Sequence, residues 1–160
     1  MEYHNIEPVY DDNSKVLVLG SFPSVKSREQ QFFYGHPSNR FWRVMSAVTG
    51  RPLPSTIDEK RDLLLNAHIA VWDVIKSCDI IGSGDSSIKN VVANDISVIL
   101  NTAEIVKIFC NGKTSYKLYR KLIEPHTGIE AIALPSTSPA NAQFSIQRLI
   151  SEWNIIRDFL

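Results

Sequence analysis

The sequence contains very little cysteine. Only Cys78 and Cys110 occur among 160 residues, each beside an apolar stretch and 32 positions apart. That spacing matches no zinc-ligand pattern, and two thiols are too few for an iron–sulfur cluster held by cysteine alone, which needs four. The four histidines show no metal-ligand spacing either. We therefore expect two buried thiols and no metal or other cofactor.

The chain also lacks an excess of either charge. It has 17 basic and 17 acidic residues, so its formal net charge is zero. Nucleic-acid-binding domains usually carry a basic patch, so any electrostatic footprint here must be local. Two basic groups could supply one, or could be merely solvated faces: Lys26, Arg28, Arg40 and Arg43, and Lys113, Lys117, Arg120 and Lys121.

Long apolar runs are absent as well. No stretch approaches the roughly 18 apolar residues that could span a bilayer, and Met1–Pro8 has neither the basic nor the apolar region of an export signal. The sequence therefore predicts a cytoplasmic protein with no membrane partner. Because no repeat, low-complexity tract or linker interrupts it, we expect residues 1–160 to form a single domain. A monomer is also expected.

Two common catalytic motifs are missing. Gly112-Lys-Thr resembles the tail of a phosphate-binding loop, but Lys107 stands where that loop needs a glycine. No Gly-x-Ser-x-Gly elbow occurs, so the usual signature of an acyl-transfer hydrolase is absent.

What the sequence does contain is a crowded stretch, Gln31–Trp42. It holds five aromatic side chains beside a histidine, an asparagine and an arginine. Aromatic side chains usually pack in cores whereas amides usually lie at surfaces, so this mixture suits a pocket for a flat, partly polar ligand. A nucleobase fits that description. Of the four histidines, only His36 is expected to have a role in such a site.

Apolar patterning predicts four strands. Continuous apolar runs are typical of strands buried on both faces, as in a parallel sheet covered by helices. The runs are Lys15–Gly20, His68–Val74, Glu104–Gly112 and Ile129–Pro135. The predicted fold class is α/β: a three-layer α/β/α sandwich around a central, mostly parallel four-stranded sheet.

Capping residues and helical spacing predict the helices. One begins at Ser38, which can cap it, and ends at Gly50, so that Asn39 and Arg40 lie in its first turn. Residues 82–90 are expected to form a polar loop, and 91–100 are ambiguous apart from a short helix capped at Asn94 or Asp95. Further helices are expected over 56–66, 113–123 and 144–160.

Three of the predicted strands end in polar segments. Gly20–Ser24 follows the first strand, Trp72 and Asp73 end the second, and Ser136–Asn141 follows the last. The carboxyl ends of parallel strands meet at one edge, where ligands bind in open α/β sheets. Serine hydroxyls and backbone N–H groups can hold phosphates locally, although a lone serine is more often a turn-former. Its repetition at two strand ends favours a nucleic-acid backbone as the partner.

Three segments together resemble the uracil-DNA glycosylase superfamily: Val16–Ser24, Phe33–Trp42 and Leu134–Asn141. The Gly-His-Pro-x-Asn-Arg-Phe-Trp core at residues 35–42 is similar to the mismatch-specific and thymine-DNA glycosylase branch. The whole pattern most resembles the hypoxanthine (deoxyinosine) DNA glycosylase family. The resemblance implies a parallel sheet covered by helices, and hydrolysis of the N-glycosidic bond of a deaminated base flipped out of double-stranded DNA.

The chain departs from other branches of that superfamily at three positions. Phe22 stands where an acidic or amide residue positions the attacking water, Ser136 where uracil-specific enzymes have a histidine, and Ala140 at a wedge position often held by leucine. The hypoxanthine family assigns the main catalytic role to the asparagine of the central stretch. The resemblance therefore implies that Asn39 is the catalytic residue, orienting water or bonding the base.

The resemblance also implies the binding residues. Asp73, Asp85 and Ser86 are weaker candidates without an assigned role. No lysine occupies a motif position, so the expected product is an abasic site without a Schiff-base step. Base contacts are expected from Ser21, Phe22, Pro23, Tyr34 and His36, and DNA contacts from Ser24, Ser136, Ser138, Ala140 and Asn141.

Several alternatives stay open at this point. Asn39 could only stabilise the start of its helix, and Tyr34 could pack against the protein rather than stack on a base. Phe41 and Trp42 fit a core better than base contacts. The excised base could be uracil or mismatched thymine. The chain could also be a non-catalytic DNA-lesion-binding domain, since Phe22 cannot activate water.

Overall fold

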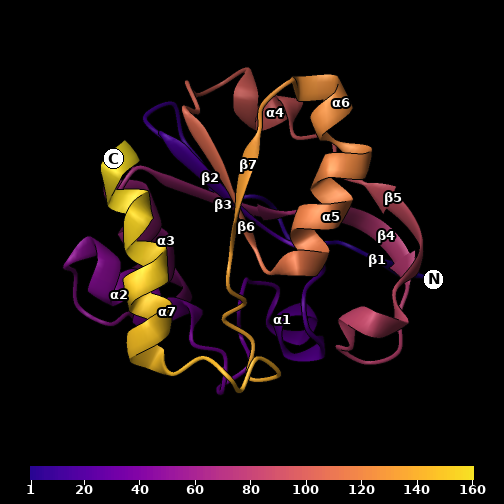
Figure 1. The fold of residues 1–160 in the computed structure, drawn as a ribbon, viewed down its shortest axis with the longest axis horizontal. Coiled ribbons are helices and arrows are strands. Elements are labelled where there is room, and N and C mark those ends of the chain that lie inside the picture. The colour runs from indigo at the N-terminus through magenta and orange to yellow at the C-terminus, as the bar shows by residue number, and fades with distance from the viewer.

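The computed structural model describes residues 1–160, and a four-stranded parallel sheet runs through its centre (Figure 1). The central strand, β2, has all five residues buried, as expected of a strand covered on both faces. The structure confirms the predicted α/β class and the parallel pairing. In spatial order the strands are β3 (Ile69–Asp73), β2 (Val16–Gly20), β6 (Lys107–Asn111) and β7 (Ala131–Leu134).

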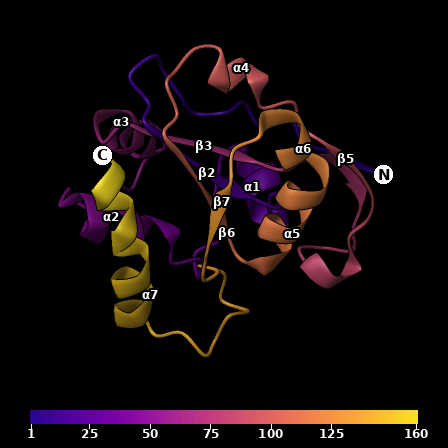
Figure 2. The ribbon, with the colours of Figure 1, turned by 45° about the horizontal axis from the view of Figure 1, so that its top comes forward.

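Helices cover both faces of this sheet. Alternate side chains of β2 point to opposite faces, with Val16 and Val18 in one buried cluster and Leu17 and Leu19 in the other. Figures 1 and 2 show the two helical layers on either side of the sheet, which is the predicted sandwich. The first cluster includes side chains of α2 (Phe41–Thr49), α3 (Ile57–Asn66) and α7 (Ile146–Trp153), and the second includes side chains of α4 (Ser97–Leu100) and α5 (Lys113–Leu122), which α6 (Glu124–Thr127) follows.

A second, antiparallel sheet was not predicted. Its strands lie in the order β1 (Glu2–Tyr3), β4 (Ile75–Asp79) and β5 (Lys89–Ala93). The strands carry mixed polar and apolar residues, and β5 has no buried residue, so none produced a continuous apolar run. The expected polar loop therefore ends at β5 and contains a short 3₁₀ turn, η1 (Asp85–Ser87). The short α1 (Val25–Gln30) was also missed.

The start of α2 differs from the prediction. The helix begins at Phe41, so Asn39 and Arg40 lie before its first turn rather than in it, and Ser38 does not cap it. The reason is a local turn: the N–H of Asn39 donates to the carbonyl of His36 at 3.0 Å, and the N–H of Arg40 donates to Thr137 at 3.0 Å. These bonds hold the backbone away from the helical path until residue 41.

The other predicted helices are largely correct. Thr56 caps α3 and forms a capping box with Glu59, as the sequence indicated. Asp95 accepts a hydrogen bond from the N–H of Ser97 at the start of α4, close to the expected cap. The closing helix is shorter than predicted, because Ser145 caps it at its start and a 3₁₀ segment, η2 (Asn154–Phe159), replaces its last turns. No helix has both the length and the apolar character needed to cross a bilayer.

Candidate active site

Four strands deliver polar residues to one edge of the parallel sheet. In the register, Gly20 of β2 lies beside Asp73 of β3, and Asn111 of β6 lies beside Leu134 of β7. The three strand ends singled out from the sequence therefore meet, as predicted. Sequence reasoning missed Asn111, although its position at the end of a predicted strand, just before a glycine, was a usable signal.

Asn39 is fixed in this edge by two hydrogen bonds to the same atom. Its Oδ1 accepts from the hydroxyl of Thr137 at 2.8 Å and from the N–H of Phe41 at 3.0 Å. An amide carbonyl has two lone pairs, and both are engaged. Because the N–H of Phe41 can only donate, the oxygen must face it, and the orientation of the amide is settled. The Nδ2 of Asn39 donates to no protein atom, and the residue is half-buried.

Thr137 is fixed in turn by Asn111. The Nδ2 of Asn111 donates to the Thr137 hydroxyl, and its Oδ1 accepts from the Thr137 N–H, both at 3.0 Å. Thr137 is fully buried, so its hydroxyl is held without competition from water. Gly112 allows this approach: it adopts φ +97°, and a Cβ there would lie 3.2 Å from that of Ser136.

Arg40 ties the last predicted loop to the central stretch. Its guanidinium donates to the carbonyl oxygens of Ser138 and Asn141, both at 3.0 Å, and to that of Phe144. Ser136 and Ser138 also accept hydrogen bonds from backbone N–H groups within the loop. The predicted DNA-contact residues of this loop are thus held in one ordered segment beside Asn39.

Asp73 is buried, with 3% of its surface exposed, and is paired with His4. The Nε2 of His4 lies 2.7 Å from Oδ2 of Asp73, and its Nδ1 accepts from the N–H of Ile6, so the ring donates through Nε2. The sequence predicted a site role for His36 alone among the histidines, whereas the structure places His4 against Asp73 at this edge. A Cβ at Gly20 would lie 2.4 Å from Oδ1 of Asp73 and 3.0 Å from the hydroxyl of Tyr34, so only glycine fits between them.

Tyr34 packs mainly against the protein. One face of its ring stacks on Phe41, with centroids 3.9 Å apart, and its φ of 52° is unusual for tyrosine. Its hydroxyl is buried and makes no hydrogen bond of good geometry. Burial and the negative charge of Asp73 raise the pKa of Tyr34 above its ordinary value, so the phenol is neutral. Phe41 and Trp42 are buried, which confirms that they belong to the core.

The loop after β2 is more enclosed than expected. Ser21, Phe22 and Pro23 are buried, and the carbonyls of Gly20 and Ser21 accept from Val74 and Ile75. The Ser21 hydroxyl donates to Oδ1 of Asp85 at 3.0 Å.

Ser24 and His36, the two other predicted contact residues, make hydrogen bonds within their own segments. Ser24 caps α1, where its side chain accepts from the N–H of Ser27. His36 is exposed, and its Nδ1 accepts from the N–H of Ser38.

Two arginines of the first basic group have structural partners. Arg28 donates to the carbonyl of Gly82 at 2.6 Å and lies 3.4 Å from a carboxylate oxygen of Glu2. Arg40 binds its loop as described above. No group of three or more His, Cys, Asp or Glu side chains is arranged to hold a metal ion.

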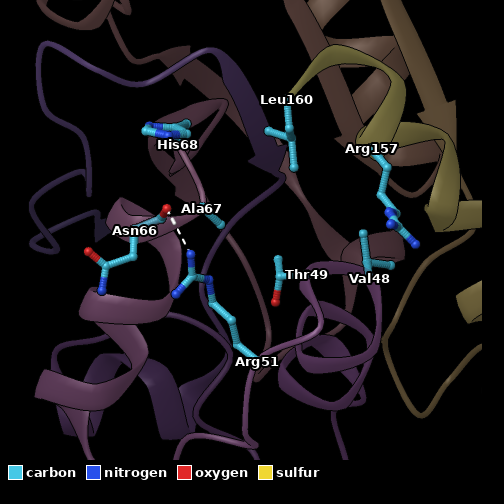
Figure 3. Close-up of a pocket in the computed structure, with 8 residues that line it drawn as sticks. All are labelled: Val48, Thr49, Arg51, Asn66, Ala67, His68, Arg157 and Leu160. Atoms are coloured by element: carbon cyan, nitrogen blue, oxygen red, sulfur yellow. Dashed lines mark hydrogen bonds between the residues drawn. The ribbon is translucent and has the colours of Figure 1, made fainter.

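A separate surface hollow of about 280 Å³ lies at the opposite end of the sheet (Figure 3). Its lining includes His68, which directly precedes β3, and Arg51, which donates to the carbonyl of Asn66 at 3.1 Å. None of the predicted site residues lines it. The chemistry expected from the sequence is therefore concentrated at the carboxyl edge instead.

Comparison with known proteins agrees with this geometry. The family model described as the Uracil DNA glycosylase superfamily matches residues 7–159. The chain belongs to the uracil DNA glycosylase superfamily. A Methanosarcina acetivorans relative named Hypoxanthine DNA glycosylase is 37% identical over 92% of this chain and 93% of its own. A Methanosarcina barkeri relative of the same name is 34% identical over 96% of both chains.

Solved structures of the superfamily share this fold. The solution structure of a candidate uracil DNA glycosylase from Methanosarcina acetivorans superposes with a TM-score of 0.81 and 34% identity, covering 94% of this chain and 93% of the other. The two chains therefore share the same overall fold. The family match and the two relatives confirm the resemblance to this superfamily that was inferred from the three sequence segments.

Proposed function

We propose that residues 1–160 form a monofunctional DNA glycosylase domain that hydrolyses the N-glycosidic bond of a flipped, deaminated base. Hypoxanthine is the proposed base, supported by the two relatives named for that activity. The observation that carries the proposal is the amide of Asn39, whose oxygen is engaged twice while its Nδ2 is left free. The product is an abasic site.

Of the two roles considered for Asn39, we propose the one in which it bonds the base. Both lone pairs of Oδ1 are occupied, so the carbonyl cannot also orient a water molecule. The remaining chemistry is donation from Nδ2. As the glycosidic bond breaks, negative charge develops on the base and positive charge on the sugar. A fixed N–H donor at a nitrogen or oxygen of the leaving base stabilises that charge without reorganisation.

The DNA backbone is proposed to lie along the loop that Arg40 holds. Ser136, Ser138 and Asn141 are half-buried and Ala140 is exposed, so the loop can present short polar groups to phosphates. Ala140 is too small to fill the space left by a flipped nucleotide. We propose double-stranded DNA as the substrate and a monomer as the acting species inside the cell.

A single-turnover excision assay tests the proposal. The protein is mixed in excess with duplexes carrying one hypoxanthine, xanthine, uracil or mismatched thymine, and alkali-labile sites are counted over time. We expect the hypoxanthine duplex to be cut fastest. Fastest cutting at uracil or thymine would overturn the choice of base, and binding of every duplex without cleavage would overturn the enzymatic proposal.

A further inference from the structure

The loop between β4 and β5 is fastened by three hydrogen bonds to the segment after β2, one to Ser21 of the candidate active site and two to α1. The Ser21 hydroxyl donates to Oδ1 of Asp85 at 3.0 Å, the N–H of Val25 donates to the Ser83 hydroxyl at 3.0 Å, and Arg28 donates to the carbonyl of Gly82 at 2.6 Å. Figure 1 shows this loop, with η1, beside α1. A polar loop that could have been a free connection is thus held against the carboxyl end of β2.

Asp85 brings a carboxylate to this edge in a reachable position. Oδ1 is fixed by Ser21, and Oδ2 accepts no hydrogen bond from the protein. The residue as a whole is exposed, while its carboxyl group faces Ser21 and the Asp73 carboxylate. Burial on that side raises the pKa of Asp85, the nearby charge of Asp73 raises it further, and the Ser21 hydrogen bond partly lowers it. A raised pKa makes the Asp85 carboxylate a stronger proton acceptor than an ordinary aspartate carboxylate.

No other side chain considered at this edge is free to deprotonate a water molecule. Phe22 has no proton-accepting atom, and the oxygen of Asn39 is engaged by two donors. Asp73 is almost completely buried and gives one carboxylate oxygen to His4. Hydrolysis of a glycosidic bond still requires a water molecule to be oriented and deprotonated, and a negative charge near the sugar cation helps.

We propose that Asp85 is the carboxylate that orients and deprotonates the attacking water, with Ser21 as its positioning residue. This inference rests on the glycosylase activity proposed above. The water oxygen bonds to C1′ of the sugar as the C1′–N bond to the base breaks, and the bonding electron pair leaves with the base. A water proton passes to Asp85, which later releases it to solvent, and the base anion takes a proton from solvent.

Asp85→Asn tests this role because it keeps the shape of the side chain and the contact with Ser21. We expect single-turnover excision of hypoxanthine to fall by roughly 10²–10⁴-fold while binding to the same duplex is unchanged or tighter. Asp58→Asn is the matched control, because this aspartate lies on α3 with 93% of its side chain exposed, and it should keep the wild-type rate. If Asp85→Asn retains a rate within about threefold of wild type, the proposal is wrong.

The pH profile separates a catalytic role from a structural one. The groups near the Asp85 carboxyl are Ser21, Asp73 with its partner His4, and the neutral Tyr34, while Arg28 holds the loop. The wild-type rate should fall as pH drops through the pKa of Asp85, and Asp85→Asn should lose this limb. Ser21→Ala removes the bond that lowers the pKa of Asp85, so the limb should move to higher pH.

A second variant tests whether activity is lost only because the loop between β4 and β5 has moved. Asp85→Ala leaves a gap that formate can enter, and added formate should restore part of the lost rate. Absence of rescue, together with an unshifted limb in Ser21→Ala, would overturn the proposal. If the wild-type protein excises no base at all, the proposed function fails instead, which the same assay distinguishes.

Discussion

The buried hydroxyl of Thr137 donates to Oδ1 of Asn39 across 98 positions of sequence, at a distance of 2.8 Å. This bond joins the loop after β7 to the central aromatic stretch. In the proposed mechanism the carbonyl of Asn39 is occupied by this bond and by the N–H of Phe41, and its own N–H groups donate to the base. The proposed role of Asn39 depends on this hydrogen bond.

Replacing Thr137 with valine should weaken excision without unfolding the protein. Valine has nearly the same shape but can neither donate to Asn39 nor accept from Nδ2 of Asn111, so the Asn39 amide loses one of the two bonds that orient it. We expect a loss of roughly tenfold in the single-turnover rate, consistent with about 1.4 kcal/mol. Thr137→Ser keeps the hydroxyl and is the control. Full additivity of Thr137→Val with Asn39→Ala would contradict the coupling, since a shared function should make the double variant little worse than Asn39→Ala.

Replacing Arg40 with alanine should loosen the DNA-contact loop. Three carbonyl oxygens, of Ser138, Asn141 and Phe144, would lose their charged donor. We expect the free energy of unfolding to fall by about 2–4 kcal/mol and amide exchange to rise in residues 136–144. Arg43→Ala, on the exposed side of α2, serves as the control. Unchanged exchange in the loop would show that these bonds do not hold it.

Replacing Tyr34 with phenylalanine separates packing from chemistry. The hydroxyl is buried without a good hydrogen bond, so its removal eliminates an unsatisfied polar group while the stacking on Phe41 remains. We expect the melting temperature to stay the same or rise, with excision within about threefold of wild type. A large loss of excision with normal stability would mean that the hydroxyl contacts the base or the water.

Much of the fold could be predicted because its central strands are buried on both faces. All five residues of β2 lie in the interior, and such runs are visible without knowledge of their partners. The antiparallel strands β4 and β5 escaped prediction because both mix polar and apolar residues, and no residue of β5 is buried. The start of α2 was misplaced because a bond from Arg40 to Thr137 overrides the local capping signal of Ser38.

The residues of the site could be predicted only in part. The central asparagine and the strand-end loops were found from motifs and their positions. The pairing of His4 with Asp73 joins residues 69 positions apart, and that of Ser21 with Asp85 joins residues 64 apart. Contacts over such separations leave no local pattern, so the placement of His4 and of Asp85 required the structure.

The most direct test of the central claim is the excision rate of Asn39→Asp on a duplex containing hypoxanthine. A carboxylate at this position still accepts from Phe41 and Thr137, so folding and the start of α2 are preserved, but no N–H remains to donate to the base. We predict a single-turnover rate roughly 10²–10³-fold below wild type, matching Asn39→Ala. A rate close to wild type in Asn39→Asp would contradict the assignment of Asn39 as the donor to the leaving base.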